Sequence, residues 1–281
     1  MIDPADPDQL SQLLRRHRVE LKHSLGQNFI VEPAARDRIA DSASLNGDDD
    51  VLEVGAGAGG LTVALARRCR RLVAVELDRR LIPVLTEVAG ALGNVEVVEA
   101  DILALDQTAL FPNGGHVVVG NIPYNLTGAL MRRLLEAAPR PRRLSLVVQK
   151  EVAERWTASG GASLATVAVQ VFATAQLRFT IPASAFMPPP RVDSACVVLE
   201  VRDRPAIDVP DLDAFFRLVE AIFQFRRKQL GGALGRISGM GSTKAGARLR
   251  EAGIDPERRA QTLDLDEWEK LYRAFNLEPG R

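Results

Sequence analysis

The stretch DDDVLEVGAGAGGLTVALARR, residues 48–68, predicts a buried strand, a glycine turn and a helix. Val51, Leu52 and Val54 form the short apolar run of a strand, and a helical apolar pattern begins at Leu61. Four glycines within residues 55–60 are more than a tight turn requires. Because such a turn exposes backbone N–H groups at the start of the next helix, the sequence predicts a ligand site here.

A second predicted strand, 71–75, is followed directly by Glu76. An acidic residue at this strand tip, about 20 residues past the glycines, is where nucleotide-binding folds hold ribose hydroxyls. Gly55, Gly57 and Gly60 also match G-x-G-x-x-G, which is a weak signal when it stands alone. The turn therefore fits either NAD or S-adenosylmethionine, and the rest of the chain must distinguish them.

The composition is that of an ordinary globular protein, with 46% hydrophobic and 26% charged residues among 281. The formal net charge is zero, so affinity for nucleic acid must come from a local patch. Cys69 and Cys196 are the only cysteines, which excludes a disulfide framework and fits a reducing compartment. The three histidines, His17, His23 and His116, are too scattered for a metal cluster, so we expect no metal.

No membrane attachment is expected from the sequence. Its apolar runs fall short of the roughly 18 residues of a membrane span. The first ten residues, MIDPADPDQL, lack the charged-then-apolar pattern of a signal peptide. We therefore expect a cytoplasmic protein.

Strand and helix patterns alternate along most of the chain. Further strands are predicted at 95–98, 116–120, 144–148, 175–179 and 194–201. A helix is predicted at 77–92 and a rigid extended loop at 186–190. This alternation predicts an α/β fold with a mostly parallel, doubly wound sheet.

The character of the sequence changes near residue 203, beyond which every pattern is helical. These predicted helices span 213–226, 227–234, 243–252, 256–260 and 265–275. We therefore predict a catalytic domain at 1–202, with a basic segment at 10–30, and a helical domain at 203–281. Residues 217–259 hold ten basic and four acidic side chains, a net charge of +6. Such an asymmetry in a neutral chain suits contact with nucleic-acid phosphates.

Asn121-Ile122-Pro123-Tyr124 leaves the predicted strand 116–120 at the sheet edge where open α/β folds bind ligands. Pro123 fixes its own φ and keeps Ile122 extended, which places the Ile122 carbonyl beside the Asn121 side-chain oxygen. Two such acceptors suit an exocyclic amino group, and the ring of Tyr124 offers a face on which a base stacks. With the amine held against a sulfonium methyl, catalysis needs only positioning and electrostatics.

Seven motifs in combination resemble the rRNA adenine N6-dimethyltransferase family, and within it the branch that acts on bacterial small-subunit rRNA. The resemblance covers nearly the whole chain. The motifs are K-H-S-L-G-Q-N-F-I at 22–30, G-A-G-A-G-G-L-T at 55–62, V-E-L-D at 75–78, E-A-D-I at 99–102, N-I-P-Y at 121–124, F-M-P-P-P-R-V-D-S at 186–194 and F-R-R-K at 225–228.

The resemblance implies a class I S-adenosylmethionine-dependent methyltransferase fold, a Rossmann-like sheet of seven mostly parallel strands, with a small all-helical C-terminal domain. It implies methyl transfer to N6 of two adjacent adenosines in the 3′-terminal hairpin of 16S rRNA within an immature 30S subunit. The product of the cofactor is then S-adenosylhomocysteine. We expect a monomer.

The family's functional residues carry over one by one. The cofactor-binding residues expected from the resemblance are Asn28, Ile30, Gly55, Gly57, Glu76, Asp101, Ile102 and Asn121. The catalytic residues expected are Asn121, Ile122, Pro123, Tyr124 and Phe186, of which Phe186 is the second stacking aromatic. The RNA-binding residues expected are Arg226, Arg227 and Lys228.

Three other functions stay open. The G-x-G-x-x-G match and Glu76 fit an NAD-dependent oxidoreductase. That function does not explain the segment 121–124 or the basic helical region. An assembly or transcription factor on a methyltransferase scaffold is a non-enzymatic alternative, against which the intact 121–124 segment argues. A large-subunit resistance methylase is disfavoured by the motifs at 186–194 and 225–228.

Overall fold

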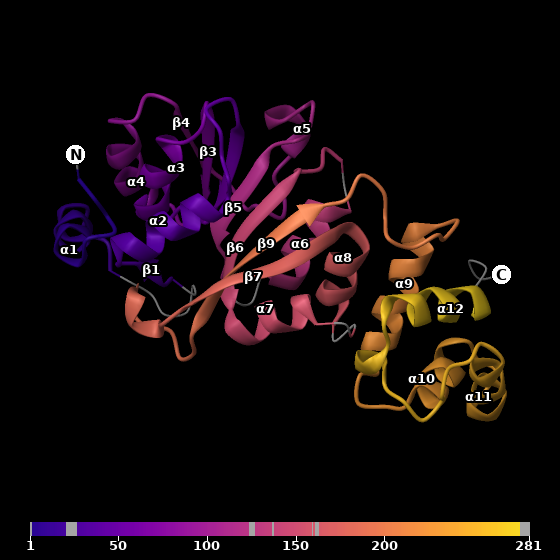
Figure 1. The fold of residues 1–281 in the computed structure, drawn as a ribbon. Coiled ribbons are helices and arrows are strands. Elements are labelled where there is room, and N and C mark those ends of the chain that lie inside the picture. The colour runs from indigo at the N-terminus through magenta and orange to yellow at the C-terminus, as the bar shows by residue number, and fades with distance from the viewer. Residues whose placement is uncertain are drawn as a thin grey trace. The chain divides into compact units, whose positions relative to one another are not determined.

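The computed structural model describes residues 2–20, 27–123, 127–136, 138–158, 160 and 163–275. They form two compact units along the chain shown in Figure 1. The larger unit comprises Met1–Thr157 with Thr174–Val201, and the smaller comprises Ala158–Ala173 with Arg202–Arg281. Among the described residues, every helix is too short or too polar to cross a lipid bilayer.

The larger unit is built on a seven-stranded sheet in the order β4-β3-β2-β5-β6-β9-β7 (Figure 1). Its strands are β2 (Asp50–Val54), β3 (Arg71–Glu76), β4 (Val95–Glu99), β5 (Val117–Asn121), β6 (Arg143–Gln149), β7 (Ala173–Ile181) and β9 (Ser194–Val201). The strands from β4 to β6 pair in parallel, and β9 runs antiparallel to β6. The predicted mostly parallel, seven-stranded sheet is confirmed.

The strand order places a ligand site at the carboxyl end of β2. From β2 the chain builds outward through β3 to β4, and it then returns to the other side of β2 as β5. Val54 at the end of β2 is in register with Val75 of β3 and Gly120 of β5. Because the order reverses between β2 and β5, a crevice opens beyond these strand ends.

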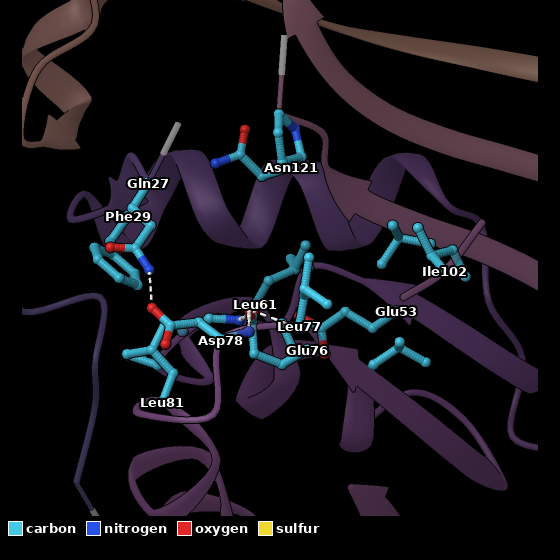
Figure 2. A pocket seen from close by; sticks show the side chains of 18 of the residues that line it. Gln27, Phe29, Glu53, Leu61, Glu76, Leu77, Asp78, Leu81, Ile102 and Asn121 are labelled. Atoms are coloured by element: carbon cyan, nitrogen blue, oxygen red, sulfur yellow. Dashed lines mark hydrogen bonds between the residues drawn. The ribbon is translucent and has the colours of Figure 1, made fainter. Parts of the chain in front are cut away.

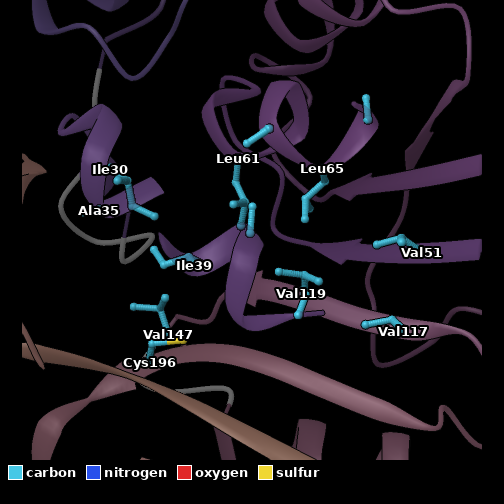
Figure 3. Packing of buried hydrophobic residues seen from close by; sticks show 14 of the residues in the cluster. Ile30, Ala35, Ile39, Val51, Leu61, Leu65, Val117, Val119, Val147 and Cys196 are labelled. Atoms are coloured by element: carbon cyan, nitrogen blue, oxygen red, sulfur yellow. The ribbon is translucent and has the colours of Figure 1, made fainter. Parts of the chain in front are cut away.

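Helices cover the sheet and seal its core. In the larger unit they are α1 (Pro7–Arg16), α2 (Pro33–Ser42), α3 (Gly60–Ala66), α4 (Ile82–Ala89), α5 (Gln107–Leu110), α6 (Thr127–Leu135) and α7 (Lys150–Thr157). Ile39 of α2 and Leu65 of α3 pack with Val51, Val119 and Val147 of the sheet (Figure 3). Apolar contacts of this kind hold the glycine turn between β2 and α3 on a rigid base.

In the larger unit, the structure differs from two local predictions. The sequence predicts an extended loop at 186–190, but β8 (Phe186–Met187) pairs antiparallel with β1 (Phe29–Ile30). A strand of two residues carries no readable alternation, so the sequence cannot reveal it. The helix expected at 77–92 begins only at Ile82, because Pro83 is suited to the first helical turn and 77–81 form the preceding turn.

The smaller unit is helical in its described part. Its elements are α8 (Leu164–Phe172), α9 (Leu212–Phe223), α10 (Leu230–Ile237), α11 (Ser242–Glu251), the 3₁₀ turn Ala260–Thr262 and α12 (Leu265–Ala274). The helix expected at 256–260 is a turn instead. Residues 158–173, expected in the larger domain, belong by contacts to this unit. Phe172 of α8 stacks on Phe216 of α9, with ring centroids 5.7 Å apart, which ties the segment to the C-terminal helices.

Candidate active site

A cavity of about 550 Å³ opens at the carboxyl end of the sheet, a volume typical of small-molecule sites. Its walls come from the turn after β2, the ends of β3, β4 and β5, and the segment 27–30 (Figure 2). All eight residues expected to bind a cofactor line it: Asn28, Ile30, Gly55, Gly57, Glu76, Asp101, Ile102 and Asn121.

The glycine turn forms the floor of the cavity in a conformation that favours glycine. Gly55 and Gly57 have φ of 70° and 60°, in the left-handed region. A Cβ atom added at Gly57 would lie 3.0 Å from Cε1 of Phe29, which is tighter than ordinary packing. Glycine at 57 therefore serves both the turn and the close approach of the segment 27–30.

Glu76 ties the end of β3 to the glycine turn. Its Oε2 accepts the Gly57 N–H at 2.8 Å, and its Oε1 accepts the Leu77 and Asp78 N–H groups at 2.9 and 2.8 Å. Burial raises the pKa of the Glu76 carboxyl, and the three N–H donors oppose that rise. Three of its roughly four acceptor positions are occupied, so the carboxylate has one position left for a ligand hydroxyl.

Asp78 and Gln27 close one side of the cavity, and neither was predicted as a site residue, although both belong to family motifs. Gln27 Nε2 donates to Asp78 Oδ2 at 2.7 Å (Figure 2). Arg80 also pairs with Asp78 and lowers the pKa of that carboxyl. The bond joins the segment 27–30 to the turn after β3, and no spacing in the sequence signals a contact between residues 51 positions apart.

Glu53 is a second site residue that sequence reasoning missed. It lines the cavity from β2, is 1% exposed, and accepts a 2.7 Å hydrogen bond from the Thr62 hydroxyl. Burial raises the pKa of Glu53 to about 8, and the hydrogen bond from Thr62 partly opposes this rise. Burial therefore favours the protonated form of this side chain. The run V-L-E-V contains an acidic residue within an otherwise apolar strand, and this exception to the pattern could have identified Glu53 as a candidate site residue.

The wall beyond β3 and β4 includes two large apolar side chains among charged ones. Leu77 lines the cavity with 60% of its surface exposed, and Ile102 lies nearby with 5% exposed. Asp101 Oδ1 accepts the Leu103 N–H at 2.9 Å, which fixes the turn after β4. An exposed leucine side chain inside a cavity offers apolar surface to a ligand ring.

Asn121 ends β5 and lines the cavity, with its backbone carbonyl oxygen 3.7 Å from where a Cβ atom of residue 55 would lie. Figure 2 shows Asn121 above Glu76 in the cavity wall. Its Nδ2 donates to the backbone carbonyl of Asn28 at 2.7 Å. Because a carbonyl only accepts, this bond identifies the nitrogen of the amide and leaves Oδ1 as an acceptor.

The other predicted catalytic residues do not all line the cavity. Pro123 lines the cavity, whereas Ile122 is 1% exposed and donates its N–H to the Val147 carbonyl at 3.0 Å. Tyr124 lies outside the described residues. Phe186 does not line the cavity: its ring is 3% exposed and packs in the apolar cluster of Figure 3. The predicted role of Phe186 as a stacking aromatic stays a prediction, since its side chain is buried here beside the paired strands β1 and β8.

The predicted RNA-binding residues lie in the smaller unit. Arg226, Arg227 and Lys228 are exposed in the turn between α9 and α10, where helical positions were expected. Among the described residues, no group of three or more His, Cys, Asp or Glu side chains is arranged to hold a metal ion.

Three features together define a class I methyltransferase fold. They are a mostly parallel sheet with the antiparallel strand β9 near its edge, a glycine turn after β2, and an acidic residue at the end of β3. The profile of the family described as "Ribosomal RNA adenine dimethylase" matches residues 18–276. The chain therefore belongs to the ribosomal RNA adenine dimethylase family and is an rRNA methyltransferase.

Individual relatives agree with this assignment. "Ribosomal RNA small subunit methyltransferase A" of Pelotomaculum thermopropionicum is 40% identical over 100% of this chain and 99% of its own length. The protein of the same name from Enterococcus faecalis is 38% identical over 96% of both chains.

Two solved structures resemble the fold over most of its length. A dimethyladenosine transferase from Plasmodium falciparum has a TM-score of 0.71 and 27% identity, covering 87% of this chain and 96% of its own. The 23S rRNA methyltransferase ErmE has a TM-score of 0.66 and 30% identity, covering 89% of this chain and 100% of its own.

Proposed function

We propose that this enzyme transfers methyl groups from S-adenosylmethionine to N6 of two adjacent adenosines in the 3′-terminal hairpin of 16S rRNA, within an immature 30S subunit. The observation that carries the proposal is the orientation of Asn121, whose Nδ2 is engaged by Asn28 so that Oδ1 is left as an acceptor at the cavity. An amide oxygen held in this way suits the amino group of an adenine.

The cavity residues fit S-adenosylmethionine. Glu76 has an acceptor position for a ribose hydroxyl, and Leu77 and Ile102 offer apolar surface to the adenine. The backbone of Gly55 and Gly57 allows close approach of the amino-acid part. S-adenosylmethionine supplies an electrophilic methyl group when it is bound.

The chain's own residues then position the target amine. Asn121 Oδ1 and the Ile122 carbonyl accept the two N6 protons, which localises the nitrogen lone pair. Pro123 fixes the turn that presents both acceptors. As the N–C bond forms, the bond between the methyl group and the cofactor sulfur would break, and S-adenosylhomocysteine would leave with that electron pair. The N6–H bond breaks after the N–C bond has formed, and the proton leaves to solvent, so a general base is not required. Tyr124 is proposed to stack on the target base.

Small-subunit rRNA is the proposed substrate because the relatives at 38–40% identity over almost full length are named for it. The 23S methyltransferase is 30% identical, so a large-subunit substrate is the second candidate. We further propose that the enzyme works as a monomer in the cytoplasm, with the exposed cations at 226–228 on the RNA.

The test is methylation of immature 30S particles and of 23S rRNA by the purified enzyme with labelled S-adenosylmethionine, followed by mapping of the modified adenosines. We expect two adjacent dimethyladenosines near the 3′ end of 16S rRNA. Methylation of 23S rRNA alone would favour the second candidate. Binding of NAD in place of S-adenosylhomocysteine in calorimetry, or absence of methylation on either RNA, would overturn the proposal.

A further inference from the structure

Residues 3–17 lie before the region matched by the family profile, yet they contribute to the cofactor cavity. Pro4 lines the cavity, and both Pro4 and Ala5 are buried. A Cβ atom added at Gly60 would meet the Ala5 nitrogen and the Pro4 carbonyl carbon at 3.7 Å, an ordinary contact distance. The backbone of residues 4–5 therefore packs directly on the first residue of α3.

An ion pair anchors this segment at one end. Asp3 Oδ1 accepts from Arg36 Nη1 at 2.6 Å and from the Ala5 N–H at 3.0 Å. The Arg36 side chain is only 6% exposed and extends from α2, the helix that follows the cavity-lining segment 27–30. A charge-assisted bond from a buried guanidinium is stronger than one at an exposed site.

The other end of the segment is anchored to α4. His17 Nε2 lies 2.6 Å from Glu87 Oε2, and Arg16 pairs with the same carboxylate. Between the two anchors, α1 buries Leu10, Leu13 and Leu14 in an apolar cluster. Its other buried members include Val63, Leu81, Val84 and Val88. Leu81 also lines the cavity, so α1 supports a second part of its wall.

We propose that residues 3–17 form a clasp that holds the cofactor in its cavity, with Asp3 and Arg36 as positioning residues. The proposal rests on the proposed function, because the ligand retained is S-adenosylmethionine or its product. If the cofactor binds tightly only when the clasp is closed, the apparent Kd rises as the closed fraction falls. Removal of the Asp3–Arg36 pair then weakens cofactor retention while leaving the amine-holding residues in place.

The test compares Asp3→Ala with the wild-type enzyme in calorimetric titration with S-adenosylhomocysteine and in stopped-flow dissociation. We expect a Kd increase of about tenfold, carried mainly by faster dissociation. The KM for S-adenosylmethionine should rise by a similar factor, with kcat at saturating cofactor unchanged. Asp3→Glu should restore most of the affinity, because it keeps the carboxylate. Asp8→Ala, which removes an exposed acid from α1, is the matched control and should bind like wild type.

Equal affinity of Asp3→Ala and wild type would overturn the clasp. Failure of the wild type to bind S-adenosylhomocysteine would instead overturn the proposed function, so the two failures are distinct. If melting curves show that Asp3→Ala does not fold, Pro4→Ala replaces it, since it removes the ring from the cavity wall and keeps the ion pair. Unchanged affinity in Pro4→Ala would then count against the clasp.

Discussion

The side-chain amide of Asn121 donates to the backbone carbonyl of Asn28 over 2.7 Å, although the two residues are 93 positions apart. The bond joins the end of β5 to the segment that closes the cavity, and it sets which atom of the amide is free. The proposed reaction needs an acceptor at this place, and the contact with Asn28 provides its orientation.

Replacing Asn121 with Ala should lower methyl transfer by about 100-fold or more, because it removes an oriented acceptor of the reacting amine. Binding of S-adenosylhomocysteine should change much less, since Glu76 and the glycine turn remain. Single-turnover methylation and calorimetry measure the two effects separately. Asn113→Ala, on an exposed loop, is the control. Equal loss of binding and turnover in Asn121→Ala would assign Asn121 to the cofactor alone.

The raised pKa of Glu53 predicts that the stability of the larger unit depends on pH. Its native pKa of about 8 lies above the ordinary value of 4.5, so between these pH values the native state keeps a proton that the unfolded state has lost. The free energy of unfolding should therefore fall as pH rises from 5 to 8, by at most about 1.4 kcal/mol per pH unit from this group. Glu53→Gln should flatten that dependence in denaturant titrations, whereas Glu32→Gln, at an exposed site, should not. An unchanged slope in Glu53→Gln would show that Glu53 is ionised in the native protein.

His116 predicts a decrease of stability in acid. Its ring is 2% exposed, stacks on Phe111 with centroids 4.1 Å apart, and has no hydrogen-bond partner for either nitrogen among the described residues. Burial lowers the pKa of His116 to about 4. Below the ordinary value of 6.5 the unfolded chain binds a proton that the native ring does not, so stability falls as pH falls toward 4.

Phenylalanine at position 116 would keep the stack on Phe111 and cannot be protonated. His116→Phe should therefore lessen the decrease of stability between pH 6.5 and 4 in thermal unfolding. The same acid slope as in the wild type would assign that decrease to other groups.

Replacing Arg226, Arg227 and Lys228 with Ala should weaken binding to the 16S rRNA hairpin and reduce its salt dependence. For every phosphate that the variant no longer neutralises, the slope of log K against log salt should become shallower by about 0.7–0.9. Filter binding at several salt concentrations measures both quantities. The control replaces three other exposed cations of the smaller unit, Arg202, Arg204 and Lys244. If the slope of log K against log salt becomes shallower only in the control variant, the RNA-binding surface lies elsewhere than the turn between α9 and α10.

Local sequence was sufficient for the sheet and for most of the cavity floor. Val51, Leu52 and Val54 lie in β2 as expected, and Gly55 and Gly57 take the left-handed conformation that glycine favours. These features depend on apolar runs and on backbone preferences of single residues, which can be read from neighbours in the chain. Glu76 lines the cavity for the same reason, because a parallel strand brings its carboxyl end to the edge where the glycine turn begins.

The placement of Phe186, the raised pKa of Glu53 and the contacts of Asp3 could not be predicted without the folded chain. Phe186 is buried because β8 pairs with β1, and the pKa of Glu53 is raised because burial between the sheet and α3 removes water from its carboxyl group. Asp3 contacts Arg36 although the two residues are 33 positions apart in the chain. Burial and contacts between distant segments arise from packing, and no periodicity within a short stretch encodes them.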